Sequence, residues 1–304
     1  MDLTQISVLV LVLVLVLTRD NIPTTILIDL GGLKRLKRRS RTCDREIEMK
    51  TTVNYGTTND ETIYATAPLT SDETLILLGE HTQVEARQQF ISRVYSVLWV
   101  QLLVTSVFIG LCNQVAPLQQ FLVSPLGMGF MWTSLVGTLV LTCTMHCMRE
   151  SLRRCPGGCS FLTVFTLMMT YILGYVGAYY STSALLMAGL STLGIFTGLS
   201  LYAVQTKYDY TDKGGYLICA LFGLFMFGIF VPFFQTSILT TMYSCGGAMI
   251  FSFYIVYDTQ LIVGGNHRSI QFRTDDIVLA ATSLYLDVVN LFLMLLDLLN
   301  GRNQ

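Results

Sequence analysis

Charge is the scarcest property of this sequence. Of its 304 residues, 13% are charged and 52% are hydrophobic, whereas soluble domains carry about 25% charged residues. The charge is also uneven, because only eight of the 19 Lys and Arg residues follow Val94. This pattern excludes an ordinary soluble domain, which spreads charge along its length. It indicates a membrane domain that confines charge to loops and tails.

Three further absences narrow the class of protein. The net charge is −1, so a nucleic-acid partner has no electrostatic support. The eight cysteines do not form the compact framework of a secreted disulfide-rich module. No Asn-x-Ser/Thr acceptor occurs in the sequence, which fits a protein with little lumenal surface.

Residues 1–85 are predicted to be a cytosolic, low-complexity and disordered N-terminal tail. The apolar run from Ser7 to Leu17 is too short for a spanning helix, which needs about 20 residues. It resembles a signal-peptide core but lacks a basic n-region and a cleavage site. The basic run Lys34–Arg41 is interpreted as a solvated segment, with contact to anionic membrane lipid as the alternative. Residues 51–71 are polar and rich in threonine, as in disordered segments.

Residues 86–304 are predicted to form an all-α, polytopic membrane domain with seven transmembrane helices. From residue 94 onward, long apolar runs alternate with short connections. Each run is apolar on all sides and long enough to cross a hydrocarbon core of about 30 Å. The predicted spans are 94–112, 128–147, 160–179, 183–204, 214–235, 238–260 and 277–299.

Basic residues in the connections predict the orientation of the domain. The loops after the first, third and fifth spans contain no charged residue, whereas those after the second, fourth and sixth spans are basic. Arg87 and Arg93 precede the first span. The positive-inside rule therefore places the N-terminus and the basic loops in the cytosol. Seven complete crossings put the C-terminus on the other side, and a re-entrant last segment would return it to the cytosol.

Glycines predict where the helices approach one another closely. Gly194 and Gly198 form a GxxxG motif in the fourth span, and such small residues let helix backbones pack tightly in membranes. Gly174, Gly177 and the pair Gly246–Gly247 offer further points of close approach.

Two aspartates within the apolar spans carry the functional hypothesis. Asp258 lies about two turns before the end of the sixth span, and Asp287 lies about 15 Å into the seventh. These spans are antiparallel neighbours, so both side chains can lie at similar depth. An ionised aspartate in a bilayer costs about 2.5 kcal/mol or more, and such residues usually face the bundle interior and mark function.

Two facing carboxylates have two distinct states. At about 4 Å and an effective dielectric of about 20, their repulsion is about 4 kcal/mol, so the pair is expected to share a proton as a hydrogen-bonded latch. When both ionise, they offer hard oxygens for a weak, transient calcium site of the kind that suits conduction. Arg149, Arg153 and Arg154 are candidates for a counter-charge to the pair. The structural alternative is that each aspartate only caps or hydrogen-bonds a neighbouring helix.

Several segments resemble the lifeguard branch of the Bax-inhibitor (transmembrane Bax-inhibitor motif) family. The segments Arg87–Tyr95 and Gln205–Thr211 are similar to the start of the first span and to the linker after the fourth span in that branch. The strongest resemblance lies in Tyr257-Asp-Thr-Gln-Leu261 and in Tyr285-Leu-Asp-Val-Val-Asn-Leu-Phe292. Together the matching segments cover residues 85–300 in order.

The resemblance implies a seven-helix fold whose last helix is central. It also implies a pH-sensitive calcium leak in the endoplasmic reticulum or Golgi membrane, suppression of cell death, and apoptosis-regulating membrane proteins as partners. The family's paired aspartates fall on Asp258 and Asp287, and its latch arginine falls among the three arginines after the second span. Some relatives carry a glutamate in the third span, where this chain has Met169 and Thr170.

Two other interpretations are open to a chain of this kind. An intramembrane aspartyl protease also uses two carboxylates that share a proton, but its Gly-x-Gly-Asp turn and Pro-Ala-Leu element are missing here. We therefore expect no enzymatic activity and no cofactor, with calcium as the transported ion. A non-conducting scaffold that regulates cell death by binding partner proteins is the alternative to the channel.

Overall fold

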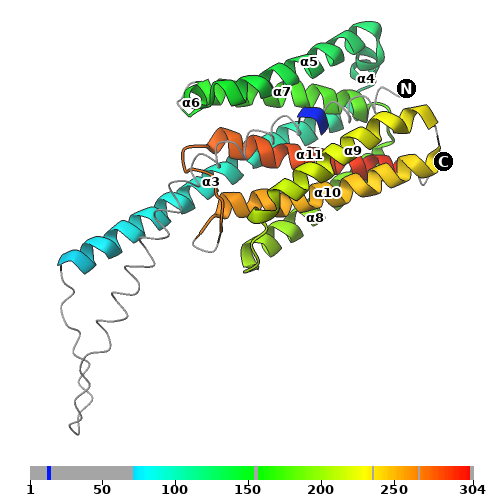
Figure 1. Cartoon of the computed structure of the whole chain (residues 1–304). Helices are drawn as coiled ribbons and strands as arrows, with labels where there is room; N and C mark the ends of the chain where they lie inside the picture. The colour runs from blue at the N-terminus through cyan, green and yellow to red at the C-terminus, as the bar shows by residue number, and fades with distance from the viewer. Residues whose placement is uncertain (1–11, 15–70, 154–156, 235, 266–267, 302–304) are drawn as a thin grey trace, which may run out of the picture. The chain divides into compact units, whose positions relative to one another are not determined.

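The structure is a computed structural model. Among the described residues, all regular secondary structure is helical (Figure 1). The described residues are 12–14, 71–153, 157–234, 236–265 and 268–301, and their side chains are described except at 71–82, 146, 149 and 301. The α-helices are α3 (Ser71–Gln114), α4 (Ala116–Val123), α5 (Pro125–Cys147), α6 (Arg149–Leu152), α7 (Gly157–Gly177), α8 (Thr182–Gln205), α9 (Gly214–Phe234), α10 (Ser237–Val263) and α11 (Ile277–Gly301), and a 3-10 turn, η1, covers Thr211–Lys213.

The prediction of seven membrane-spanning helices is confirmed. Seven helical segments within the described residues are long and apolar enough to cross a membrane, and each overlaps one predicted span. They are Gln83–Gln114, Pro125–Met145, Gly157–Gly177, Thr182–Gln205, Thr211–Phe234, Ser237–Val263 and Ile277–Asn300.

The N-terminal part of the chain is described only in two places. The chain divides into one unit of residues 1–21 and 87–304 and a second unit of residues 22–86. In the second unit the described residues are the helical start of α3, which begins at Ser71, upstream of the expected domain boundary at residue 86. In the first unit, residues 12–14 of the apolar run Ser7–Leu17 are helical, with Val12 and Val14 buried. The rest of that run and the basic run Lys34–Arg41 lie outside the described residues.

Local sequence signals explain where several helices begin and end. The Ser124 hydroxyl accepts a hydrogen bond from the Gly127 backbone N–H at 3.2 Å, and Pro125 occupies the first turn of α5. Both features favour a helix start, because a serine cap satisfies a free N–H and proline needs no donor there. At the other end of a span, α10 stops at Gly264, whose φ of 62° is costly for any residue with a side chain.

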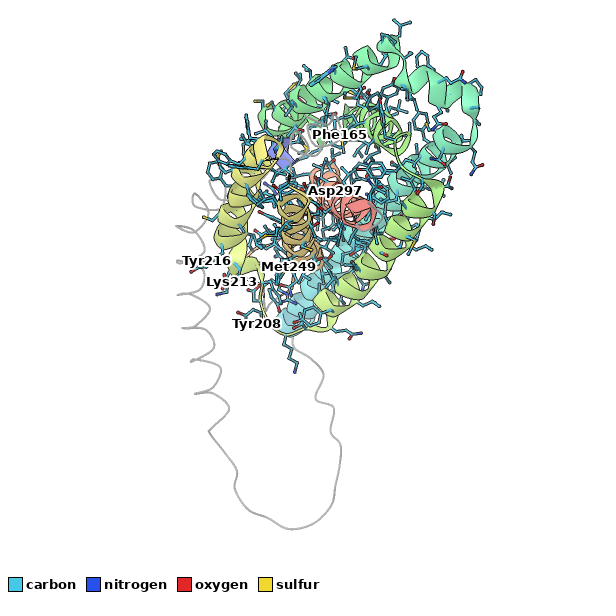
Figure 2. All side chains as sticks on the ribbon, turned by 90° about the vertical axis from the view of Figure 1, so that its right-hand side faces the viewer. Phe165, Tyr208, Lys213, Tyr216, Met249 and Asp297 are labelled. Atoms are coloured by element: carbon cyan, nitrogen blue, oxygen red, sulfur yellow. The ribbon has the colours of Figure 1, made fainter. Side chains whose placement is uncertain are left out.

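Helix α11 is the central helix of the bundle, as the family resemblance implied. In its most apolar window 83% of the residues are buried, compared with 22–56% in the other six spans. Viewed from one end of the bundle, α11 with Asp297 is surrounded by the other helices (Figure 2). Helix α10 packs along α11, α8 packs on both, and α5 packs on α7 in an outer layer (Figure 1).

The glycines follow the packing prediction only in part. A Cβ atom added at Gly174 would lie 2.5 Å from the Phe108 ring, and one added at Gly247 would lie 2.5 Å from the Met294 sulfur. Neither position has room for a side chain unless its neighbour moves. At Gly194 and Gly198, by contrast, a Cβ atom would meet no atom of the described residues within 4 Å. For the described part of the chain, the prediction for this GxxxG motif is therefore wrong, because spacing alone does not say which helix face is packed.

Candidate functional site

The two aspartates of the predicted site lie in the most deeply buried part of the bundle. Asp258 on α10 and Asp287 on α11 are both 0% exposed, and the side chains next to them in each helix are buried as well. Such burial is rare for carboxyl groups, which are almost never fully buried unless they have partners. Both aspartates have interactions with other groups in the structure.

Two contacts fix how α10 and α11 are aligned along their axes. The Ser244 hydroxyl of α10 donates a hydrogen bond to the Asp297 carboxylate of α11. One turn further along, Gly247 of α10 lies directly under the side chain of Met294 of α11. The two pairs share one antiparallel register, since three residues forward on α10 correspond to three residues back on α11.

This register brings the two aspartates close in depth. Positions 244, 247, 251, 254 and 258 form one face of α10, because residues three and four apart lie on the same side of a helix. Continuing the register places Asp258 level with Ser283, which precedes Asp287 by one turn. The two carboxyl groups are therefore separated by about 6 Å along the helix axes. The sequence-based expectation of similar depth agrees with this alignment.

A network of neutral side chains crosses the bundle beside the acidic pair. The Tyr285 hydroxyl is 2.8 Å from the Thr105 hydroxyl, which is 3.1 Å from the Thr170 hydroxyl. The Gln101 amide donates a hydrogen bond to the Thr166 hydroxyl at 2.9 Å. Helices α3, α7 and α11 are thus joined by polar contacts between side chains that carry no formal charge.

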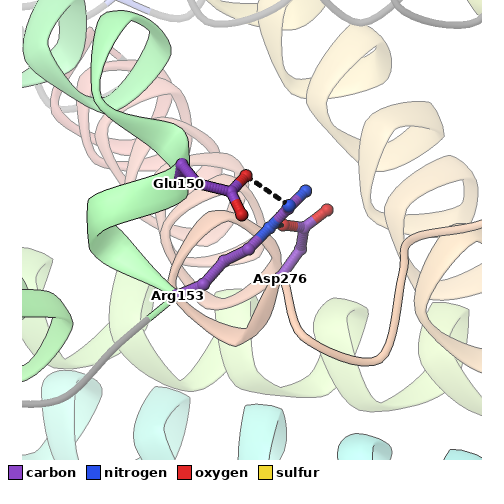
Figure 3. Close-up of polar contacts among 3 residues, drawn as sticks. All are labelled: Glu150, Arg153 and Asp276. Carbon is purple, nitrogen blue, oxygen red and sulfur yellow. Dashed lines mark hydrogen bonds and ion pairs between the residues drawn. The ribbon is translucent and has the colours of Figure 1, made fainter.

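Of the three candidate latch arginines, Arg153 is the one whose side chain is described. Its Nε atom lies 2.8 Å from a carboxylate oxygen of Asp276, and its Nη1 atom lies 2.8 Å from Glu150 (Figure 3). The Asp276 side chain is 1% exposed and the Glu150 side chain is 81% exposed. The hydrogen bond to Asp276 raises the pKa of the Arg153 guanidinium.

The Arg153 contact joins the connection after α5 to the start of α11. Asp276 directly precedes α11, and its backbone carbonyl accepts a hydrogen bond from Ala280. Arg154 lies outside the described residues, as does the side chain of Arg149. The sequence predicted an arginine counter-charge to the acidic pair, whereas the ion pairs of Arg153 are with Asp276 and Glu150. Sequence reasoning singled out neither of these carboxylates.

We call an arginine that joins two segments through its guanidinium a clamp; Arg153 is the first, and Arg87 forms a second at the end of α10. Its guanidinium donates hydrogen bonds to the carbonyl oxygens of Val263 at 3.2 Å, Phe272 at 2.5 Å and Leu261 at 2.9 Å. The cation also lies 5.2 Å from the centre of the Phe90 ring. A positive group at a helix C-terminus is favourable, because the last carbonyls of a helix carry partial negative charge.

Arg268 forms a third clamp, at the end of α8. Its guanidinium donates to the carbonyl oxygens of Ala203, Thr206 and Tyr208. The buried Gln260 amide of α10 donates to the Tyr208 carbonyl at 3.0 Å. Loops that follow α8 and α10 are therefore tied together at the same end of the bundle.

Asp209 anchors the same two loops through hydrogen bonds from backbone N–H groups and from hydroxyls. Its carboxylate accepts hydrogen bonds from the Thr211 hydroxyl and N–H at 2.6 and 2.9 Å, and from the Ser269 N–H and hydroxyl at 2.8 and 3.0 Å. Burial by itself would raise the pKa of Asp209, but these donors outweigh it and lower the pKa below its ordinary value.

Sequence reasoning treated Arg87 and Arg268 as topology signals and missed their structural role. One signal was present for Asp276, since an aspartate directly before an apolar helix is a frequent cap. No signal in a single sequence indicated which arginine would form an ion pair with Asp276. For Asp209, the short spacing Asp-Tyr-Thr was an available sign of a local side-chain turn.

Comparison with known proteins agrees with this architecture. The family described as inhibitor of apoptosis-promoting Bax1 matches residues 87–304. Protein lifeguard 3 of Homo sapiens is 30% identical over 230 residues, which are 74% of this chain and 72% of the relative. Protein LIFEGUARD 4 of Arabidopsis thaliana is 31% identical over 219 residues, which are 70% of this chain and 85% of the relative. The chain, with its seven apolar helices around a central last helix, is an integral membrane protein that belongs to the family of inhibitors of apoptosis-promoting Bax1.

Proposed function

We propose that this protein is a pH-sensitive calcium leak channel of an intracellular membrane and that Asp258 and Asp287 line its ion path. The observation that carries the proposal is the complete burial of both carboxyl groups, on facing sides of α10 and α11 and about one turn apart. Each ionised carboxylate in a membrane costs about 2.5 kcal/mol or more. Two such costs on adjacent helices are difficult to explain by helix capping alone.

The chemistry of the pair supplies the pH dependence. When the two carboxyl groups share a proton, the pair acts as a latch that holds α10 and α11 together and binds calcium poorly. Loss of that proton leaves two negative groups that repel each other and present oxygens to calcium, which prefers hard oxygen ligands. The leak is therefore expected to increase as the pH rises. Transport needs no cofactor and no covalent chemistry, so the proposed activity is not enzymatic.

The proposed cellular setting combines charge distribution with family membership. Arg87, Arg153 and Arg268 lie at one end of the bundle, as their contacts with α10, α11 and α8 demonstrate. The positive-inside rule assigns that end, and with it the N-terminus, to the cytosol. We propose the endoplasmic reticulum or Golgi as the location, as the sequence resemblance implied, and family membership supports suppression of apoptosis as the role. Partners in this role are calcium, membrane lipid and apoptosis-regulating membrane proteins.

The experiment that tests the proposal measures calcium flux in liposomes. The full chain is reconstituted and calcium influx is recorded across a pH series for wild type, Asp258→Asn, Asp287→Asn and the double variant. Asp275→Asn is the matched control, because Asp275 is an exposed aspartate just before α11. We expect the wild type and the control to pass more calcium at higher pH, and the double variant to lose this dependence.

The same experiment separates the channel from the scaffold. If folded wild-type protein passes no calcium at any pH, the leak proposal fails and the non-conducting scaffold becomes the better account. If the wild type conducts but the double variant keeps the full pH dependence, the leak stands and the acidic pair is not its sensor.

A further inference from the structure

The interface between α10 and α11 carries acidic residues at both ends, and between them lie the buried Asn290 and an apolar stretch. At the end near the basic loops it carries Asp258 and, one turn away on α11, Asp287. At the other end it carries the hydrogen-bonded pair Ser244 and Asp297. Asp287 and Asp297 are about 15 Å apart along α11. An ion that moves along this interface must pass the apolar stretch between them.

Met294 packs closely against α10 in that stretch. A Cβ atom on Gly247 would lie 2.5 Å from the Met294 sulfur and 2.9 Å from its Cγ and Cε atoms, so the methionine side chain rests directly on the α10 backbone. Met294 is 1% exposed. In the register set by these contacts, the fully buried Phe251 faces the next turn of α11. The apolar side chain of Met294 thus lies between the acidic pair and Asp297. Phe251 lies at the depth of Asn290.

Asn290 lies on the acidic-pair side of this apolar level. Its side chain is 0% exposed, and its Nδ2 atom donates to the Leu286 carbonyl at 2.8 Å. Among the described residues, its Oδ1 atom has no hydrogen-bond partner. A buried acceptor without a donor costs about 1–3 kcal/mol. We therefore expect this oxygen to accept a hydrogen bond from water or to bind a cation. It lies one turn beyond Asp287 on the same face of α11.

We propose that Met294, seated on Gly247, is the hydrophobic constriction of the ion path, and that Asn290 contributes an oxygen ligand just before it. The inference rests on the proposed leak function and assigns its path to the α10–α11 interface. A hydrophobic constriction closes a pore because water leaves it, which removes the hydration that a cation needs. Opening then requires the Met294 side chain to leave Gly247.

The test compares Met294 with a methionine that faces away from the interface. Met294→Ala shortens the side chain, and Met294→Gln keeps its length but makes it polar. Met249→Ala and Met249→Gln are the matched controls, because Met249 is on α10 but 64% exposed. The full chain is reconstituted in liposomes, and initial calcium influx is measured for all variants at one pH. Size-exclusion chromatography confirms that each variant remains folded.

We expect both Met294 variants to raise the influx roughly tenfold, a change equivalent to about 1.4 kcal/mol, while both Met249 variants match the wild type. Asn290→Leu, which keeps the size but removes the oxygen, is expected to lower the influx. If Met294→Ala does not fold, Met294→Gln decides the question, since it preserves the volume. A conducting wild type with unchanged Met294 variants overturns the constriction but leaves the leak intact. Absence of influx in the wild type and in every variant overturns both.

Discussion

Replacing Arg87 by methionine is expected to destabilise the bundle at the end of α10. The change removes three hydrogen bonds, to the carbonyls of Leu261, Val263 and Phe272, while it keeps the length of an apolar side chain. Hydrogen bonds to charged groups contribute about 1.5–3 kcal/mol each. Because the three carbonyls share one donor group and lie where water can partly replace it, the total loss is about 2–4 kcal/mol rather than the full sum.

The assay is thermal unfolding of the detergent-solubilised protein. A loss of this size lowers the unfolding temperature by roughly 5–15 °C if the helical domain of residues 87–304 unfolds as one unit. Arg93→Met is the matched control, because Arg93 is on the same helix and exposed. Arg87→Lys is expected to fall between wild type and Arg87→Met, since lysine keeps the charge but loses the planar guanidinium. If Arg87→Met unfolds at the same temperature as Arg93→Met, the clamp is not a source of stability.

Three further predictions concern the other polar contacts. Arg153→Gln removes the cation beside a buried aspartate and is expected to cost roughly 2–4 kcal/mol in thermal unfolding, whereas Glu150→Gln, at an exposed partner, is expected to cost less than about 1 kcal/mol. Asp209→Asn is expected to lose about 1–2 kcal/mol at neutral pH. Because the folded-state pKa of this carboxyl group is lowered, the deficit should disappear as the pH falls through that lowered pKa, which unfolding measured from pH 7 into acid would reveal. Tyr285→Phe is expected to cost about 1–2 kcal/mol through its buried hydroxyl, and Tyr216→Phe, at a 74% exposed tyrosine, is expected to leave the unfolding temperature unchanged.

The helices could be predicted from the sequence because one physical requirement dominates them. A chain in lipid must satisfy every backbone polar group internally, so long apolar runs become helices almost regardless of their detailed sequence. The same reasoning selected Asp258 and Asp287, because the energetic cost of a carboxylate in an apolar run is visible in one sequence. Both side chains are fully buried in the structure.

The clamps could not be predicted, because their partners are backbone carbonyls or distant side chains. Arg87 donates hydrogen bonds to residues more than 170 positions away. Every residue has a backbone carbonyl, so the sequence does not indicate which carbonyls will accept these bonds. The Gly194 motif failed for a related reason, since small residues permit close approach without specifying a partner. Met294 looked like any other apolar residue of the last span. Its contact with Gly247 became visible only when the register of α10 and α11 was known.

The arginines from which the orientation is predicted also restrict how the acidic pair can respond. Arg87 holds the end of α10, and Arg153 holds the start of α11 through Asp276. Both clamps lie at the end of the bundle nearest to Asp258. Repulsion between the two carboxylates therefore cannot easily separate the helices at that end, because it would have to break several charge-assisted hydrogen bonds. The easier displacement is at the apolar stretch beyond Asn290, where the Met294 side chain rests on Gly247 and is held by packing. If the proposed leak operates, we expect ionisation of the pair and release of the Met294 side chain to be two parts of one opening movement.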